Sequence, residues 1–259
     1  MPYPYKCALI TGATSGIGES FADLLAPDAT LLLTGRNAKK LAELKTRFDV
    51  YGHKVETITA NLADPNDRRA LLEAAKNLPV DLLINNAGLG AYGAFTQTDP
   101  HQEAEMVAVN VTAIIELSRA LLPIMIARAQ IAKSRAGMIV VSSTASITPI
   151  PFLATYAATK AFERHWGEAL AEELRHDPIN ILVLCPGATR TNFFHRARME
   201  TSLLKNIEEP EAVAAKGLDA LGRQNVFISN TATRLALAPA LLPRRLLTSA
   251  IGYFLRKQH

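Results

Sequence analysis

The stretch Thr11-Gly12-Ala13-Thr14-Ser15-Gly16-Ile17-Gly18 decides how this chain folds, because it joins an apolar strand pattern to a helical pattern. Gly12 permits a tight exit from the strand, and Gly16 lets the backbone come close to a pyrophosphate. Gly18 lets the new helix pack closely on a sheet, and the start of that helix offers free N–H groups to an anion. The stretch therefore predicts a phosphate-binding loop, with a purely structural turn as the alternative.

The alternation of short apolar runs and amphipathic stretches continues to about residue 228. Several strand runs are rich in Val, Ile and Leu without a polar face, as expected for parallel strands covered on both sides. The order predicts one doubly wound α/β domain of the Rossmann type, with seven parallel strands and helices on both faces. The predicted strands are 6–11, 30–34, 54–59, 81–85, 137–142, 180–185 and 225–228, and the predicted helices are 17–26, 38–50, 65–77, 101–130, 156–175 and 210–222.

Composition excludes several other classes of protein. The 259 residues are 49% hydrophobic and 20% charged, which fits neither a disordered chain nor a fibre. No apolar run reaches the about 18–20 residues of a membrane span, and the N-terminus does not resemble a secretory signal. The only cysteines, Cys7 and Cys185, lie in apolar strand runs, so we interpret them as core residues. No cluster has zinc-ligand spacing, so we expect no metal, and we expect a cytoplasmic location.

The net charge of +4 belongs to the C-terminal end. Residues 229–259 hold five basic residues and no acidic one, which leaves residues 1–228 near neutral and argues against a nucleic-acid surface. We take residues 1–230 as the domain and 231–259 as a basic, amphipathic helical extension. The apolar stripe of 231–257 has three possible contacts: its own subunit, a second subunit, or an anionic membrane surface. Packing on protein is the favoured interpretation, because an exposed stripe would promote aggregation.

Further motifs follow the glycine loop in a fixed order. Asn85-Asn86-Ala87-Gly88 follows the fourth strand, Ser143 ends the fifth, and Tyr156-Ala157-Ala158-Thr159-Lys160 opens a helix. Asn110 interrupts an apolar helix between them, and Pro186-Gly187 follows the sixth strand. Over residues 5–192 this set resembles the short-chain dehydrogenase/reductase family. The resemblance implies an oxidoreductase whose catalytic residues are Asn110, Ser143, Tyr156 and Lys160.

Tyr156 and Lys160 share one face of a helix, because they are four residues apart. The Lys160 ammonium and a positively charged nicotinamide in a desolvated cleft favour the phenolate. We therefore expect the pKa of Tyr156 to be lowered from about 10 and its side chain to act as general acid or base. Ser143 would bond the substrate oxygen. The resemblance suggests that Asn110 holds a water linking Lys160 to solvent, and a structural helix–helix bond is the alternative. An ordinary surface Tyr–Lys pair is the alternative for the motif as a whole.

The residue after the second strand decides the cofactor. No acid stands in Thr34-Gly35-Arg36-Asn37, and Arg36 suits a 2′-phosphate, so we expect NADP(H), with NAD(H) as the alternative. Ser15 offers a further hydroxyl. Family members usually carry Asp-Leu after the third strand, where this chain has Asn61-Leu62, so the adenine contact is a weaker inference. The predicted cofactor-binding residues are Gly12, Thr14, Ser15, Gly16, Ile17, Gly18, Arg36, Asn61, Leu62, Asn86, Ala87, Gly88, Tyr156, Lys160, Pro186, Gly187, Thr189 and Thr191.

The candidate residues of the substrate pocket are mostly apolar and aromatic, so we expect a small-molecule substrate that is a mostly apolar ketone, aldehyde or secondary alcohol. The candidate wall consists of Leu89, Tyr92, Phe95, Ile150, Phe152, Leu153, Phe193, Phe194 and Met199, with Arg190, Arg196 and Arg198 nearby for an anionic end or as solvated residues. Helices 101–130 and 156–175 resemble the pairing elements of a homodimer or homotetramer. The favoured function is an NADP(H)-dependent carbonyl reductase. The alternatives are an NAD-linked alcohol dehydrogenase, a non-catalytic NADP(H)-binding regulator and a peripheral membrane protein.

Overall fold

The computed structural model describes residues 3–197, 199 and 206–232, and the predicted extension from residue 233 onward lies outside them. A seven-stranded parallel sheet has the order β3-β2-β1-β4-β5-β6-β7 and confirms the predicted fold class. Each predicted strand is present within one or two residues at its ends. The strands are β1 (Cys7–Thr11), β2 (Thr30–Gly35), β3 (Val55–Thr59), β4 (Leu82–Asn85), β5 (Ala136–Val141), β6 (Ile179–Cys185) and β7 (Val226–Ile228).

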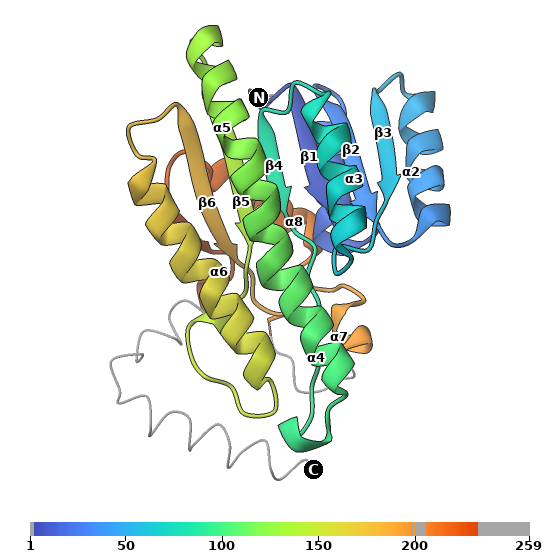
Figure 1. The fold of residues 1–259 in the computed structure, drawn as a ribbon, viewed down its shortest axis with the longest axis vertical. Coiled ribbons are helices and arrows are strands. Elements are labelled where there is room, and N and C mark those ends of the chain that lie inside the picture. The colour runs from blue at the N-terminus through green and yellow to red at the C-terminus, as the bar shows by residue number, and fades with distance from the viewer. Residues whose placement is uncertain (1–2, 198, 200–205, 233–259) are drawn as a thin grey trace.

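Helices cover both faces of this sheet (Figure 1). On one face lie α1 (Gly16–Leu25), α2 (Ala38–Val50) and α8 (Pro210–Ala220). On the other lie α3 (Pro65–Lys76), α5 (Ile114–Ala132) and α6 (Ala154–Glu173). The strand order reverses direction between β1 and β4, where α/β sheets of this kind bind their ligands.

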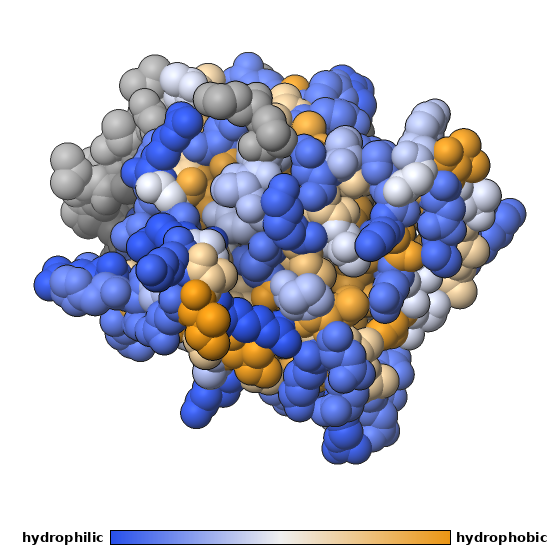
Figure 2. Space-filling view, turned by 90° about the horizontal axis from the view of Figure 1, so that it is seen from above, coloured by the Kyte–Doolittle hydropathy of each residue, from blue (hydrophilic) through white to orange (hydrophobic). Residues whose placement is uncertain are grey.

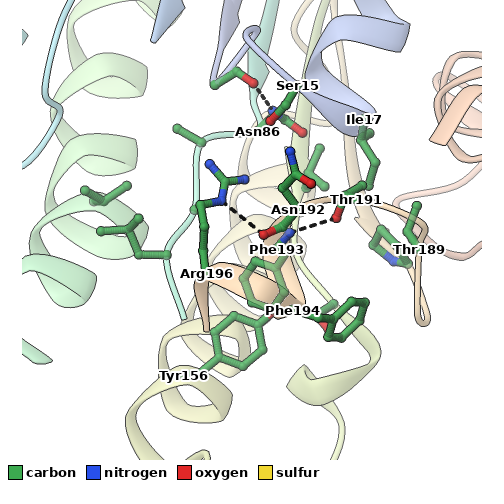
Figure 3. A pocket seen from close by; sticks show the side chains of 18 of the residues that line it. Ser15, Ile17, Asn86, Tyr156, Thr189, Thr191, Asn192, Phe193, Phe194 and Arg196 are labelled. Atoms are coloured by element: carbon green, nitrogen blue, oxygen red, sulfur yellow. Dashed lines mark hydrogen bonds between the residues drawn. The ribbon is translucent and has the colours of Figure 1, made fainter. Parts of the chain in front are cut away.

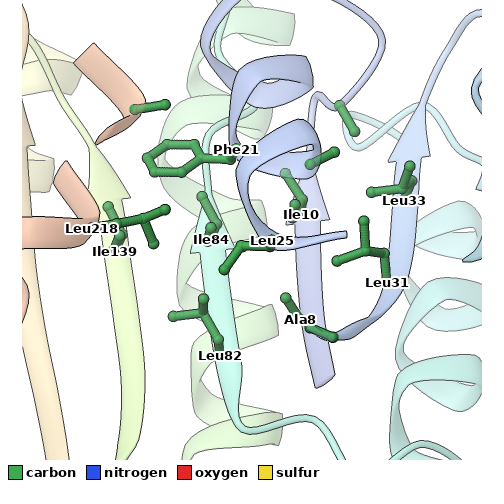
Figure 4. Packing of buried hydrophobic residues seen from close by; sticks show 14 of the residues in the cluster. Ala8, Ile10, Phe21, Leu25, Leu31, Leu33, Leu82, Ile84, Ile139 and Leu218 are labelled. Atoms are coloured by element: carbon green, nitrogen blue, oxygen red, sulfur yellow. The ribbon is translucent and has the colours of Figure 1, made fainter. Parts of the chain in front are cut away.

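Alternate residues of the buried strands supply the two cores. On β1, Ala8 and Ile10 face α1, whereas Cys7 and Leu9 face the opposite layer. Figure 4 shows Phe21 of α1 among the aliphatic side chains of the first core. Burial raises the pKa of the Cys7 thiol to about 12 and that of Cys185 to about 11. Both cysteines are therefore neutral core residues at physiological pH, as the sequence predicted.

Side-chain caps explain where several helices begin. Asn37 accepts a hydrogen bond from the Lys40 N–H at 3.0 Å at the start of α2. Asp64 and Asp99 cap α3 and α4 (Pro100–Val107) in the same way, each followed by a proline at the first helical position. Proline is favoured there because its φ suits the helix and its missing N–H has no intrahelical partner.

The long helix predicted at 101–130 is interrupted. Between α4 and α5 lies a π-helical segment, Ala108–Ala113, which contains Asn110. The whole span Pro100–Ala132 is also apolar enough to cross a membrane, with a mean hydropathy of 1.6 in its most apolar window, which the sequence analysis did not predict. Half of that window is buried inside the domain, as in the core helix of a globular protein.

The surface seen from the top of Figure 1 is mostly hydrophilic, and apolar residues show through it in small groups (Figure 2). Among the described residues the large exposed apolar side chains are scattered over several elements, and Ile131 on α5 is 84% exposed.

Candidate active site

A cavity of about 1270 Å³ opens at the carboxyl ends of the strands. Figure 3 shows Ser15, Ile17 and Asn86 toward one end of it and Tyr156 with Phe193 and Phe194 toward the other. This volume exceeds the about 300–1,000 Å³ of a typical small-molecule site, so it has room for a cofactor and a substrate together. The predicted site residues that line it are Gly12, Thr14, Ser15, Ile17, Arg36, Asn61, Leu62, Asn86, Ala87, Gly88, Ser143, Tyr156, Lys160, Pro186, Gly187, Thr189 and Thr191.

Three predicted site residues do not line the cavity: Gly16, Gly18 and Asn110. Gly16 has φ +58°, and a Cβ there would collide with the side chain of Thr191 from the loop after β6. A Cβ on Gly18 would overlap the carbonyl oxygen of Gly12. Both glycines therefore allow close packing around the glycine loop. The roles of Gly16 toward a pyrophosphate and of Gly18 in packing the helix on the sheet stay predictions.

Thr11 ties the glycine loop to the loop after β4, and sequence reasoning did not single it out. Its hydroxyl oxygen accepts hydrogen bonds from the backbone N–H groups of Asn86 (2.9 Å) and Ala87 (3.0 Å). In return the Asn86 amide donates to the Thr11 and Gly12 carbonyl oxygens, at 2.9 and 3.1 Å. The two loops are thus held as one rigid cradle.

This cradle fits the phosphates of a dinucleotide. Gly12 has φ +65°, and a Cβ there would lie 2.9 Å from the Ala87 Cα, so only glycine fits the turn. Ser15 precedes α1 without making a side-chain capping bond, which leaves the first N–H groups of the helix free of a side-chain cap. Free N–H groups and the helix dipole together favour a phosphate at this point.

Tyr156 and Ser143 meet at the inner part of the cavity. Tyr156 lies in the first turn of α6, and Ser143 follows β5 as the cap of the short 3₁₀ segment Thr144–Ser146. Both side chains line the cavity, and Ser143 is among the groups that lower the pKa of Tyr156, while its hydroxyl accepts from the Ala145 N–H at 3.1 Å. This places a phenol and a hydroxyl side by side, the pair that a carbonyl oxygen needs for protonation and stabilisation.

The pKa of Tyr156 is raised, not lowered as the sequence analysis predicted. Desolvation by burial contributes most, because it disfavours the charged phenolate. The Lys160 ammonium and the Ser143 hydrogen bond act in the expected direction, and a buried carboxylate, Glu163, opposes them. The sequence-based expectation counted neither the cost of burying a phenolate nor this carboxylate.

Lys160 points at Glu163. Its Nζ lies 2.9 and 3.0 Å from the two carboxylate oxygens and donates a third bond to the Val141 carbonyl at 3.0 Å. Burial lowers the pKa of Lys160, but attraction to Glu163 and Tyr156 outweighs it, so the net shift is upward. Burial raises the pKa of Glu163 to about 7. The only sequence signal for Glu163 is its spacing of three residues from Lys160, which equally describes an exposed salt bridge.

Asn110 serves the predicted alternative, a structural bond between elements. Its Oδ1 accepts from the Leu89 N–H at 2.9 Å, and its amide donates to the Leu89 carbonyl (2.9 Å) and the Thr159 hydroxyl (3.0 Å). Both amide hydrogens are therefore used within the protein. The role of Asn110 in a proton relay through water stays a prediction.

Two arginines face the outer part of the cavity. Arg36 is half-exposed and its Nη1 lies 3.1 Å from Glu105 Oε1. Arg196, from α7 (Phe193–Arg196), also lines the cavity, and its Nε donates to the Asn192 carbonyl at 3.3 Å (Figure 3). Burial and the charge of Arg36 lower the pKa of Arg196. Two like charges sharing one cavity favour the binding of an anion between them.

The loop after β6 is ordered by its own hydroxyl groups. Thr189 donates to the Gly187 carbonyl at 3.2 Å, and Thr191 Oγ1 accepts from the Phe193 N–H at 3.3 Å. Asn61 forms a local turn, because its side chain accepts from the Ala63 N–H at 3.2 Å while its own N–H bonds Asp67. Its predicted contact with adenine stays a prediction.

The apolar wall near Tyr156 is smaller than predicted. The Phe193 ring lies 5.2 Å from the Tyr156 ring, centroid to centroid. Arg190 is exposed and pairs with Glu209 at 2.7 Å, so it does not face the cavity, and Arg198 lies outside the described residues. Of the predicted wall, Leu89, Ile150, Leu153, Phe193, Phe194 and Met199 line the cavity, whereas Tyr92, Phe95 and Phe152 do not.

Comparisons with known proteins agree with this geometry. The family model described as short chain dehydrogenase matches residues 6–202. A very-long-chain 3-oxoacyl-CoA reductase of Kluyveromyces lactis is 31% identical over 223 residues, which is 84% of this chain and 63% of the relative. The ketoacyl reductase HetN of Nostoc sp. is 32% identical over 214 residues, covering 81% of this chain and 72% of the relative. The chain thus spans about three fifths of the length of the first of these relatives.

A solved structure shows the same fold with a cofactor in it. The short-chain dehydrogenase from Sphingobium yanoikuyae in complex with NADPH superposes with a TM-score of 0.81 and 28% identity, covering 94% of this chain and 95% of that one. The seven-stranded sheet and the Ser143, Tyr156 and Lys160 side chains that line the cavity agree with these comparisons. The chain belongs to the short-chain dehydrogenase family.

Proposed function

We propose that this protein reduces the keto group of an apolar 3-oxoacyl thioester to a hydroxyl group, using NADPH. The observation that carries the proposal is the Tyr156 phenol, which shares with Ser143 and Arg36 the lining of one cavity and lies against the Phe193 ring. The names of the relatives from Kluyveromyces lactis and Nostoc sp. support a ketoacyl substrate.

The chain's own residues account for the proton and for orientation. Ser143 and Tyr156 would both bond the keto oxygen, and the bound nicotinamide supplies the hydride. As the carbonyl carbon receives the hydride, its oxygen takes the phenolic proton of Tyr156, so that a phenolate remains and is reprotonated from solvent. Desolvation keeps Tyr156 in the protonated form that this step needs.

Arg36 and Arg196 support NADPH over NADH. The 2′-phosphate of NADPH is the anionic group that distinguishes the two cofactors, and an arginine fork binds it well. The positive charges of Arg36 and Arg196 repel each other, and a bound 2′-phosphate would offset this repulsion. Arg36 keeps donors for it beside its single bond to Glu105.

A series of 3-oxoacyl-CoA substrates of increasing chain length tests the proposed function, with NADPH absorbance as the readout. We expect kcat/KM to rise with each added methylene, by up to about fourfold where it is fully buried. Phe193→Ala should flatten that rise, whereas Phe95→Ala is the matched control because Phe95 is 65% exposed and lies outside the cavity. Faster turnover of small polar ketones or sugars than of any 3-oxoacyl thioester would contradict the proposal.

A further inference from the structure

Among the described residues, Glu163 is the most deeply buried ionisable side chain near the site, and its carboxyl, with a pKa of about 7, is ionised above neutral pH. It lies on α6, has no exposed surface and directs both carboxylate oxygens at the Nζ of Lys160. Lys160 lines the cavity and Glu163 does not, so the carboxylate lies behind the ammonium as seen from the substrate side. In the described part of the chain no other carboxylate bonds Lys160.

The groups packed around this pair add no further charge at neutral pH. From β6 comes the Cys185 thiol, whose pKa burial raises to about 11. From the end of β5 come the Ser142 hydroxyl, which donates to the Lys160 backbone carbonyl at 2.9 Å, and the Val141 carbonyl, which accepts from Lys160 Nζ at 3.0 Å. On α6 itself the remaining charged neighbours, Arg164 and Glu168, pair with each other at 2.6 Å.

We propose that Glu163 is a positioning residue that anchors the Lys160 ammonium and offsets its charge, so that Tyr156 stays a phenol and is ready to donate a proton in reduction. The part of this inference in which Tyr156 donates a proton during reduction rests on the proposed function. The charge effect on Tyr156 is a property of the protein alone.

The physical argument compares Lys160 with and without its counter-ion. An unpaired ammonium near Tyr156 stabilises the phenolate. The Lys160 ammonium lies within 3.0 Å of the Glu163 carboxylate, and the two opposite charges together form a dipole whose field at Tyr156 is much weaker. Accordingly, Glu163 raises the pKa of Tyr156 and Lys160 lowers it. Reduction then proceeds across neutral pH, and alcohol oxidation, which needs the phenolate, requires alkaline pH.

The direct test is a titration of Tyr156 followed by NMR in the cofactor-free protein. The six tyrosines are labelled with ¹³C at Cζ, and the Tyr156 signal is assigned by its loss in Tyr156→Phe. In the wild type we expect a midpoint above the 10.0 of an ordinary tyrosine. A wild-type midpoint below 9 would overturn the proposal without any further variant.

Glu163→Gln removes the charge and keeps the shape of the side chain. We expect the Tyr156 midpoint to fall by about one pH unit or more, because one unit is only about 1.4 kcal/mol of differential interaction. Glu163→Asp keeps the charge and should restore the wild-type midpoint. Glu168→Gln is the matched control on the same helix and should leave it unchanged. A Glu163→Gln midpoint equal to that of the wild type, or a fall as large in Glu168→Gln, would contradict the proposal.

The pH profile of turnover gives the second readout. In Glu163→Gln the alkaline rise of NADP⁺-linked oxidation of a 3-hydroxyacyl-CoA should move to lower pH by the same amount as the NMR midpoint. An unmoved profile together with an unmoved midpoint would overturn the role of Glu163. If the wild type turns over neither the 3-oxoacyl nor the 3-hydroxyacyl substrate, the proposed function fails, while the NMR titration still decides the charge effect.

Discussion

At the scale of single residues, we propose that Arg36 decides which cofactor binds. Its guanidinium lines the cavity at the end of β2, and one of its nitrogens is held by Glu105. The pair is half-exposed, so it contributes little to stability and its main effect is to orient Arg36. Glu105 holds only Nη1, so the other nitrogens of the guanidinium remain for a 2′-phosphate.

Arg36→Asp should weaken NADPH binding by more than about tenfold, or about 1.4 kcal/mol, because it replaces the phosphate partner with a like charge. Binding of NADH, which lacks the phosphate, should change much less. Fluorescence titration of both cofactors checks this. Glu105→Gln, which frees Arg36, is the control and should leave NADPH binding as strong or stronger. Equal losses for NADPH and NADH in Arg36→Asp would show that Arg36 does not read the phosphate.

Glu163 also makes stability depend on pH. Burial raises its pKa from 4.5 to about 7, so between these values the folded chain holds a proton that the unfolded chain has released. Its contribution to stability is full below pH 4.5 and is lost as pH rises through about 7.

Urea unfolding at several pH values measures that loss. Between pH 4.5 and about 7, we expect the free energy of unfolding of the wild type to fall, relative to that of Glu163→Gln, by on the order of 1–3 kcal/mol. Glu168→Gln, whose side chain is 37% exposed, should follow the wild type. A difference between wild type and Glu163→Gln that stays flat, or grows with pH, would show that Glu163 is ionised at low pH.

At the scale of elements, the π-helical segment Ala108–Ala113 places Asn110 where three parts of the chain meet. Asn110 bonds both backbone groups of Leu89, and through Thr159 it connects to the carbonyl of Tyr156, to which Thr159 donates at 2.8 Å. Segments of this kind often occur at functional sites. Here the segment sets the position of the first turn of α6, and with it Tyr156.

Asn110→Leu should destabilise the fold by about 1–3 kcal/mol, because it leaves the partly buried N–H and carbonyl of Leu89 without their Asn110 partners. We expect kcat to fall more than NADPH affinity, since the change displaces Tyr156 and not the phosphate cradle. Urea unfolding and steady-state kinetics check both effects, with Thr112→Ala in the same segment as control. Wild-type stability and kcat in Asn110→Leu would contradict this positioning role.

At the scale of the molecule, the sheet was predictable because the buried strands are nearly unbroken apolar runs, as in Leu31–Leu33. The site was predictable because its residues follow strand ends, which parallel strands bring to one edge. The π-helical segment Ala108–Ala113 could not be predicted, because a short apolar stretch has nearly the same sequence pattern in an α-helix and in a π-helix. Glu163 was missed because burial of a Lys–Glu pair depends on how α6 packs against β5 and β6, which local spacing does not contain.

The most direct measurement of the central claim compares wild type with Tyr156→Phe in NADPH-linked reduction of a long-chain 3-oxoacyl-CoA. NADPH loss is followed by absorbance and the 3-hydroxyacyl product by mass spectrometry. The wild type should form one product per NADPH consumed. Tyr156→Phe should lose well over nine tenths of kcat, more than about 1.4 kcal/mol of barrier, while NADPH binding stays within a few-fold. A Tyr156→Phe variant that keeps more than about a tenth of wild-type kcat would contradict Tyr156 as the proton donor.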